Sequence, residues 1–337
     1  MATGFAVEIS DLRGWACQVG RASDDLDSAR RYAVGNIADA EFGRILETIT
    51  RDYAAMLSQF HNILQADSTG LDHESAALNA SADVYKVVDG RSRDHFSQLA
   101  GGITLHTVDD GVANGFNDAL FAATMLAPPD GSGVALPEVS FGWILDKVCD
   151  LVIWVGGPDP RKYVTRWIAG NIGKAALQAS AWQHVADCVD VADANLKSGR
   201  AAITRTWTGP ASTAAGAQMD KWGTCLIDQS SKMRQMARNL HDAVGEAIKM
   251  AQCVVDIIKE VISLVSASFS NAAIPLYGQW KLIKTVKEAI KMINQARKVI
   301  TVFWGFLNMM KSFIQVCIST FSAAALPPAP SAAAVPG

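Results

Sequence analysis

Apolar residues recur every three or four positions through two long stretches in the second half of the chain. Before a short break these positions are Trp182, Val185, Val189, Ala192, Leu196, Gly199 and Ile203. After it they are Met219, Trp222, Leu226, Gln229, Met233, Met236, Leu240, Ala243, Ala247, Met250, Val254, Ile257, Val261 and Leu264, with Gln229 as the one polar member. Such steps place residues on one side of a helix, as in the seam of a coiled coil. The pattern predicts two long facing helices over residues 161–268.

The break between these stretches contains Trp207-Thr208-Gly209, followed by Pro210. Glycine allows backbone conformations that other residues resist, and proline suits the first position of a helix. The segment therefore predicts a helix, a tight turn and a second helix, with Trp207 at the bend.

The first hundred residues show the same spacing in two shorter stripes. The first stripe is Leu12, Trp15, Val19, Ala22, Leu26 and Ala29, and the second is Phe42, Leu46, Ile49, Tyr53, Met56, Phe60 and Ile63. They predict a helical hairpin over residues 1–98, with its bend near Gly35 to Ala40 and a second arm that continues to Asp89. Asp67-Ser68-Thr69-Gly70 is expected to interrupt that arm, because glycine and short polar side chains weaken helix interiors.

The remaining segments form a connector, a basic helical region and a tail. Glycine and proline break residues 99–160 into a connector with short helices expected at 108–126 and 141–155. Residues 276–324 predict amphipathic helices with an apolar face opposite Lys281, Lys284, Lys287, Lys291 and Lys298. The Pro/Ala-rich tail, 325–337, is expected to be extended and mobile. The fold class predicted is therefore all-α, an elongated bundle of long antiparallel helical hairpins.

Charge is distributed unevenly along the chain. Residues 1–110 carry 17 acidic and 9 basic side chains, whereas residues 259–337 carry 8 basic and 2 acidic ones. The net charge of the whole chain is −3, which does not favour nucleic-acid binding. The lysines of the C-terminal region could bind an anionic membrane or an acidic partner. The alternative is a core helix with a charged outer face, for which the acidic N-terminal hairpin offers an internal counterpart.

Six cysteines show no spacing typical of a metal site. Cys188 and Cys225 lie at similar distances on either side of Trp207, so they would be nearly level on facing helices. A disulfide between them is one interpretation, and two buried thiols that pack as small apolar side chains is the other.

The tripeptide Trp207-Thr208-Gly209, set between two heptad arms and followed by Pro-Ala-Ser-Thr-Ala-Ala, resembles the Trp-x-Gly (WXG) family of type VII secretion substrates. The resemblance covers roughly residues 161 to 265, and the segment Tyr163 to Gly170 is similar to the lead-in of longer actinobacterial members. It implies a helical hairpin that is exported without a cleaved signal peptide. The first residues of the chain agree with this expectation, because no basic region precedes an apolar run there.

Tyr85 and Asp89 follow the YxxxD pattern of PE-like type VII substrates, at the end of the N-terminal hairpin. The alternative is a helix-surface tyrosine beside a solvated aspartate. By resemblance to fused PE/PPE-like proteins, Trp207, Gly209, Tyr85 and Asp89 would form one composite secretion signal, with the two hairpins side by side and Tyr85 near Trp207. The implied partners are the secretion ATPase of a type VII system and a WXG-family partner or a second copy of the chain.

No motif for phosphate binding, nucleophilic catalysis or zinc binding is visible, and the histidines are scattered. We therefore expect a non-enzymatic protein without cofactor or metal, secreted or in the cell envelope, that acts as a type VII substrate or as the delivery part of a toxin or effector system. Two alternatives stay open: an oligomeric envelope- or membrane-interacting helical protein, and an intracellular helical adaptor. The uncharged stretch 261–280 is expected to be a helix end, a turn and a helix start, and residues 299–310 are apolar but too few to span a membrane.

Overall fold

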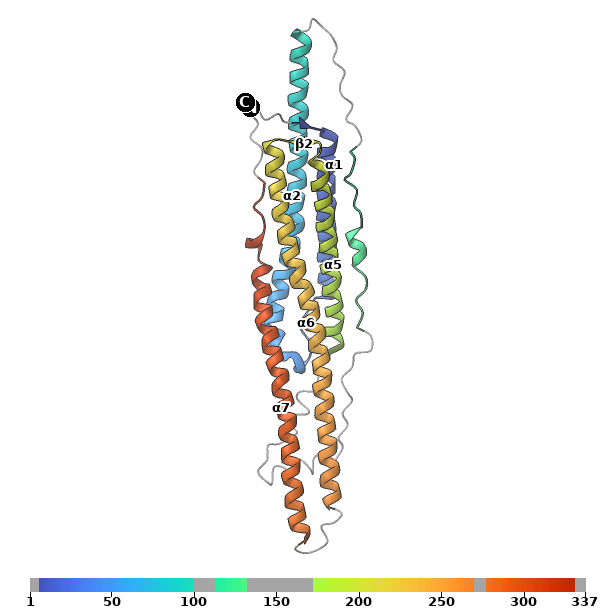
Figure 1. Ribbon diagram of the computed structural model, residues 1–337, viewed down its shortest axis with the longest axis vertical. Helices are drawn as coiled ribbons and strands as arrows, with labels where there is room; N and C mark the ends of the chain where they lie inside the picture. The colour runs from blue at the N-terminus through green and yellow to red at the C-terminus, as the bar shows by residue number, and fades with distance from the viewer. Residues whose placement is uncertain (1–5, 100–112, 132–171, 270–276, 331–337) are drawn as a thin grey trace.

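The structure is a computed structural model that describes residues 6–99, 113–131, 172–269 and 277–330. In these residues the protein is an elongated all-α bundle, as predicted (Figure 1). Its helices are α1 (Ile9–Asn36), α2 (Glu47–Leu99), α5 (Ile172–Ile203), α6 (Pro210–Phe269) and α7 (Tyr277–Thr320), with short 3-10 turns η1 (Arg44–Leu46), η2 (Ala122–Met125) and η3 (Ala323–Ala325). Two short strands, β1 (Ala6–Val7) and β2 (Trp207–Thr208), form an antiparallel pair.

The five helices pack in a closed order around one core. Helix α1 lies between α2 and α5, α6 lies between α5 and α7, and α7 returns to contact α2. One end of α2 extends beyond the β1–β2 pair, and at the opposite end α6 and α7 continue together past the other helices (Figure 1). The molecule is therefore a rod with two different ends.

Every member of the two N-terminal stripes is buried, and so is nearly every member of the two later ones. Only Ile257 and Leu264, near the end of α6, are partly exposed. The hydrophobic spacing thus identified the inward faces of α1, α2, α5 and α6, because each helix must turn its apolar side to the shared core.

Aromatic side chains fill the middle of this core. Phe60 of α2 lies 4.0 Å from Trp182 of α5 between ring centroids, and Phe321, just after α7, stacks near both. The buried hydroxyl of Tyr53 donates a hydrogen bond to Gln178 and accepts one from the Trp182 indole, each at 2.7 Å. These bonds satisfy polar groups that would otherwise be costly to bury.

Helix α2 continues without a break through residues 67–70, so the predicted interruption is wrong. Helix α6 supplies the reason. The buried Asp67 carboxyl group accepts a hydrogen bond from Gln229 at 3.0 Å, and Gly70 faces the Trp222 ring so closely that a Cβ there would overlap it. Tertiary contacts therefore outweigh the weak helix propensity of this segment.

The connector does not form the helix expected at 108–126 in the residues that the structure describes. Residues 113–131 run along α1 and α5 with only the turn η2. Asp118 is paired with Arg21, and Asn195 bonds the backbone N–H of Ala119 and the carbonyl of Leu120. These contacts satisfy backbone groups that a helix would have paired internally. The second helix, expected at 141–155, lies outside the described residues.

Where amphipathic helices were predicted over residues 276–324, the structure has one helix, α7. The turn expected within residues 261–280 falls at 270–276, outside the described residues. The inner face of α7 packs on α6 and α2, and Lys311 pairs with Asp52 of α2 at 3.2 Å. The tail does not extend freely as predicted: up to residue 330 it lies against α6, where Gln218 donates to the carbonyl of Pro328 at 2.6 Å.

Candidate recognition site at the WxG end of the bundle

The turn between α5 and α6 is set by its glycine and proline. Gly209 has a φ of 107°, which only glycine adopts readily, and Pro210 is the first residue of α6. The Ser212 hydroxyl donates to the carbonyl of Trp207 at 2.7 Å, and the Thr213 N–H begins the α6 ladder by donating to the carbonyl of Gly209. The sequence therefore predicts this turn and the roles of Gly209 and Pro210 correctly, but not the bonds of Ser212 and Thr213.

The N-terminal strand covers one side of this turn, which was not predicted from the sequence. Val7 pairs with Trp207, and the Glu8 N–H donates to the Thr206 carbonyl at 3.1 Å. Asp11, in the first turn of α1, accepts a hydrogen bond from the Thr206 hydroxyl at 2.8 Å. The only signal in the sequence is a short apolar segment before α1, too brief to read as a strand.

Trp207 sits in a cluster of three aromatic rings. Its ring centroid lies 6.1 Å from that of Trp15 in α1 and 6.3 Å from that of Tyr85 in α2, and both pairs are edge-to-face. Such arrangements add about 0.5–1.5 kcal/mol per pair beyond the burial of the rings. The predicted proximity of Tyr85 and Trp207 is thus confirmed, and the two hairpins meet there side by side.

The Trp207 indole is not presented to solvent, since its exposed fraction is 3%. Trp15, Tyr85 and strand β1 enclose the ring. Thr208 and Asp89 are the motif-associated side chains that are exposed. Trp207 and Gly209 shape the end of the bundle, while Asp89 lies on the next turn of α2 beyond the half-buried Tyr85.

The two cysteines that were considered for a disulfide are free thiols. Although they flank the turn at similar distances, they face different neighbours: Cys188 lies 3.8 Å from the Asp25 carbonyl oxygen in α1, and Cys225 lies 3.7 Å from that of Ala325. Burial raises the pKa of both thiols, to about 12 for Cys188 and about 11 for Cys225. They pack as small apolar groups, the alternative weighed from the sequence.

The predicted lysine cluster lies in α7, far along the rod from the WxG turn (Figure 1). Lys284, Lys287 and Lys291 are exposed. Lys281 belongs to the same helix, but its side chain lies outside the described set. The described ion pair between α2 and α7 joins Asp52 to Lys311, outside this cluster.

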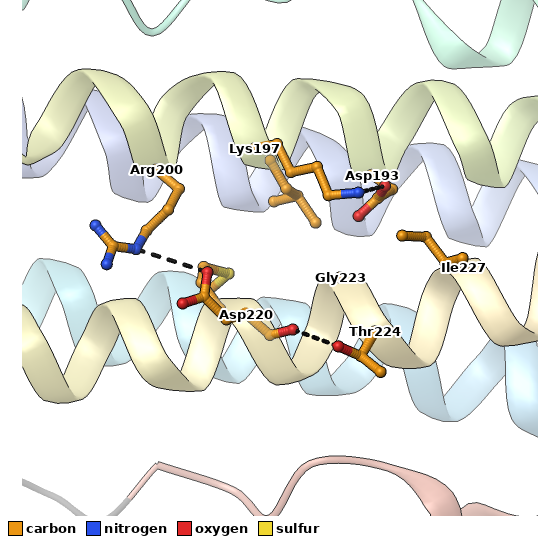
Figure 2. A pocket seen from close by; sticks show the side chains of 9 residues that line it. Asp193, Lys197, Arg200, Asp220, Gly223, Thr224 and Ile227 are labelled. Atoms are coloured by element: carbon orange, nitrogen blue, oxygen red, sulfur yellow. Dashed lines mark hydrogen bonds and ion pairs between the residues drawn. The ribbon is translucent and has the colours of Figure 1, made fainter.

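A small pocket of about 130 Å³, lined by both charged and apolar side chains, opens between α5 and α6 (Figure 2). Lys197 pairs with Asp193 at 2.6 Å, and Arg200 approaches Asp220 at 3.9 Å. Burial raises the pKa of Asp193. Each acid in the pocket faces a base, which suits an ion-paired surface more than acid–base catalysis, where a titratable group must be within reach of a substrate.

In the described part of the chain, no three His, Cys, Asp or Glu side chains come together as a metal site. One described helical segment, Lys284–Thr320 of α7, is long and apolar enough to cross a membrane by length and composition, so the apolar stretch is longer than residues 299–310 suggested. A core helix passes the same test, and α7 packs on α6 and α2.

No known protein family, curated protein or solved structure matches this chain. The resemblance to WXG proteins therefore rests on the motif residues of the sequence.

Proposed function

We propose that the protein is a non-enzymatic substrate of a type VII secretion system, recognised at the end of the bundle where the WxG turn meets Tyr85 and Asp89. The observation that carries this proposal is the contact between the Tyr85 and Trp207 rings, which joins two motifs that are more than a hundred residues apart in the sequence. The chain thereby supplies in one molecule the pair of hairpins that minimal substrates supply as two.

In this proposal the motif residues divide into two roles. Trp207 and Gly209 are positioning residues, since the indole is buried and the glycine sets a backbone angle. Asp89 and the adjoining exposed surface of α2 contact the secretion ATPase. The negative charge of Asp89 and the helical extension of α2 beyond the turn present that surface to a partner (Figure 1).

Secretion of single-residue variants tests this division. We expect the wild-type chain to reach the medium of an actinobacterial host only when the host's type VII ATPase is intact. Asp89→Ala should lower the secreted fraction about tenfold or more, as the loss of one charge-assisted contact of 1.4 kcal/mol would do. Asp89 is exposed, so the melting temperature of the variant should stay unchanged.

Asp72→Ala is the matched control, because Asp72 is exposed on the same helix but well before the Tyr85 turn. It should be secreted like the wild type. Secretion from a host that lacks the ATPase, or equal retention of both variants, would contradict the proposal. Tyr85→Phe, which keeps the ring contact, separates packing from any role of the hydroxyl.

A further inference from the structure

Helix α7 carries a straight stripe of exposed side chains whose character changes halfway along. Lys284, Lys291 and Lys298 follow one another at intervals of seven, and Val302, Met309 and Val316 continue the same side of the helix. The three apolar members are 73%, 63% and 48% exposed, respectively. A basic half and an apolar half therefore share one face.

The apolar half of the stripe is not needed to build the core. The opposite face of α7 already packs inward through Phe303, Leu307, Met310, Ile314 and Cys317, all of them buried. Between residues 299 and 320 the helix has a single charged side chain, Lys311, and it is paired with Asp52. An outer face without free charge but with exposed Met and Val is typical of an interaction surface.

The composition of this helix points to lipid. Segment Lys284–Thr320 contains an 18-residue window with a mean hydropathy of 1.3, and only 28% of that window is buried. The inner face of α7 is packed on α6 and α2, so only its outer face is available to contact a lipid bilayer. That geometry suits a helix lying in the plane of a bilayer surface rather than across it.

A second copy of the chain fits the stripe less well. Two α7 helices packed in parallel would set lysine against lysine, and two packed antiparallel would set each lysine half against an apolar half. The acidic α1–α2 hairpin could neutralise the lysines, but its exposed large apolar residues in the described chain are only Val34, Val87 and Val88. None of these arrangements satisfies both halves of the stripe.

We propose that this stripe binds the surface of an anionic lipid bilayer. Val302, Met309 and Val316 enter the boundary between headgroups and acyl chains, while Lys284, Lys291 and Lys298 lie against lipid phosphates. Lysine suits that place because its long apolar stem can run along the membrane while the ammonium group stays with the headgroups. This property concerns a different part of the rod from the secretion signal and does not depend on it.

Vesicle flotation with the full chain tests the proposal. Vesicles of phosphatidylglycerol and phosphatidylcholine in equal parts should carry the protein to the top of the gradient, whereas phosphatidylcholine alone should not. Each lysine near such a surface contributes about a fivefold gain in binding, so the triple variant Lys284→Gln, Lys291→Gln, Lys298→Gln should bind roughly a hundredfold more weakly. High salt should weaken the wild type in the same direction.

The matched control replaces three exposed basic residues of α6 that lie off the stripe, Lys221→Gln, Arg238→Gln and Lys259→Gln. It removes the same net charge and should float like the wild type. A second triple variant, Val302→Ser, Met309→Ser, Val316→Ser, should lose at least about tenfold in binding because less apolar area leaves water. Its melting temperature should match that of the wild type, since these side chains are exposed.

Three results would overturn the proposal. One is binding to both vesicle types alike. Another is equal loss of binding in the lysine variant and its control. The third is failure of the wild type to float while light scattering shows an oligomer that the serine variant abolishes, which would assign the stripe to a second copy or another protein.

Discussion

Contacts with α6 explain the identity of two residues of α2, Asp67 and Gly70. Gly70 leaves room for the Trp222 ring, and the Asp67 carboxyl meets Gln229, the single polar member of the long α6 stripe. In the sequence these features looked unrelated: Gln229 was an exception in a heptad, and the Asp-Ser-Thr-Gly segment was a helix breaker. Each feature is explained by the other, because the α2 segment and the α6 residues contact each other. The pattern of one helix alone does not show this contact.

Replacing Gly70 with alanine should destabilise the fold, because the new methyl group overlaps the Trp222 ring. Overpacking of this kind costs about 1–3 kcal/mol of unfolding free energy. Gly90→Ala on the same helix is the matched control, since a Cβ there meets nothing within 4 Å. It should stabilise by about 0.5–1 kcal/mol, the helix propensity difference. Urea unfolding measures both changes, and equal shifts in the two variants would contradict the packing argument.

The buried Asp67 carboxyl should make stability depend on pH. Complete burial raises its pKa to about 7, while Gln229 lowers it to a smaller extent. In the unfolded chain the pKa of Asp67 is about 3.9. Between about pH 4 and pH 7 its carboxyl group is therefore protonated in the folded state and ionised in the unfolded state. This contribution to stability is fully present below pH 4 and is lost as the pH rises to 7.

Asp67→Asn keeps the shape and stays neutral at every pH. From pH 5 to pH 8 the unfolding free energy of the wild type should fall by roughly 2–3 kcal/mol relative to this variant. Thermal unfolding at the two pH values measures the difference. A constant difference between the two proteins across that range would show that Asp67 does not titrate there.

At the scale of elements, the sequence predicts those whose apolar side faces one continuous core. The inward face of α1, the turn after it, and the α5–α6 bend follow from periodicity and from Gly209 and Pro210. The connector residues 113–126 were wrongly expected to be helical, because their backbone is bonded by side chains of other elements. Strand β1 was missed for the same reason: it exists only because β2 lies beside it.

Arg21 should hold the connector against α1. Its guanidinium bonds Asp118 and the Phe116 carbonyl, and the Asp118 hydrogen bond raises the pKa of Arg21. Arg21→Ala should make local opening of residues 113–131 easier by about 1–3 kcal/mol and speed limited proteolysis there by about 5- to 150-fold. Arg51→Ala, an exposed residue of α2, should leave the cleavage rate unchanged. Faster cleavage in both variants would indicate general destabilisation.

At the scale of the whole molecule, the two ends of the rod have different surfaces. The end with the WxG turn joins α1, α2, α5 and α6, and it carries the exposed Asp89 (Figure 1). In the described residues the other end consists of α6 and α7, with its own small cluster of Val261, Ala289 and Ile293. Hydrophobic spacing predicts the bundle and its hairpins. It does not predict that α6 and α7 extend beyond the other helices. The length of a helix does not show where its ends lie relative to those of its neighbours.

The pairing of β1 with β2 has a consequence for how the protein is made. Ala6 and Thr208 are hydrogen-bonded across 202 positions of the chain. During synthesis, Tyr85 and Asp89 leave the ribosome long before the turn that contains Trp207 is made. Until then β1 has no β2 strand with which to pair. A polypeptide truncated before residue 208 would contain Tyr85 and Asp89 but could not form the β1–β2 pair or enclose Trp207. The complete WxG end of the bundle therefore forms only in chains whose translation has passed residue 208.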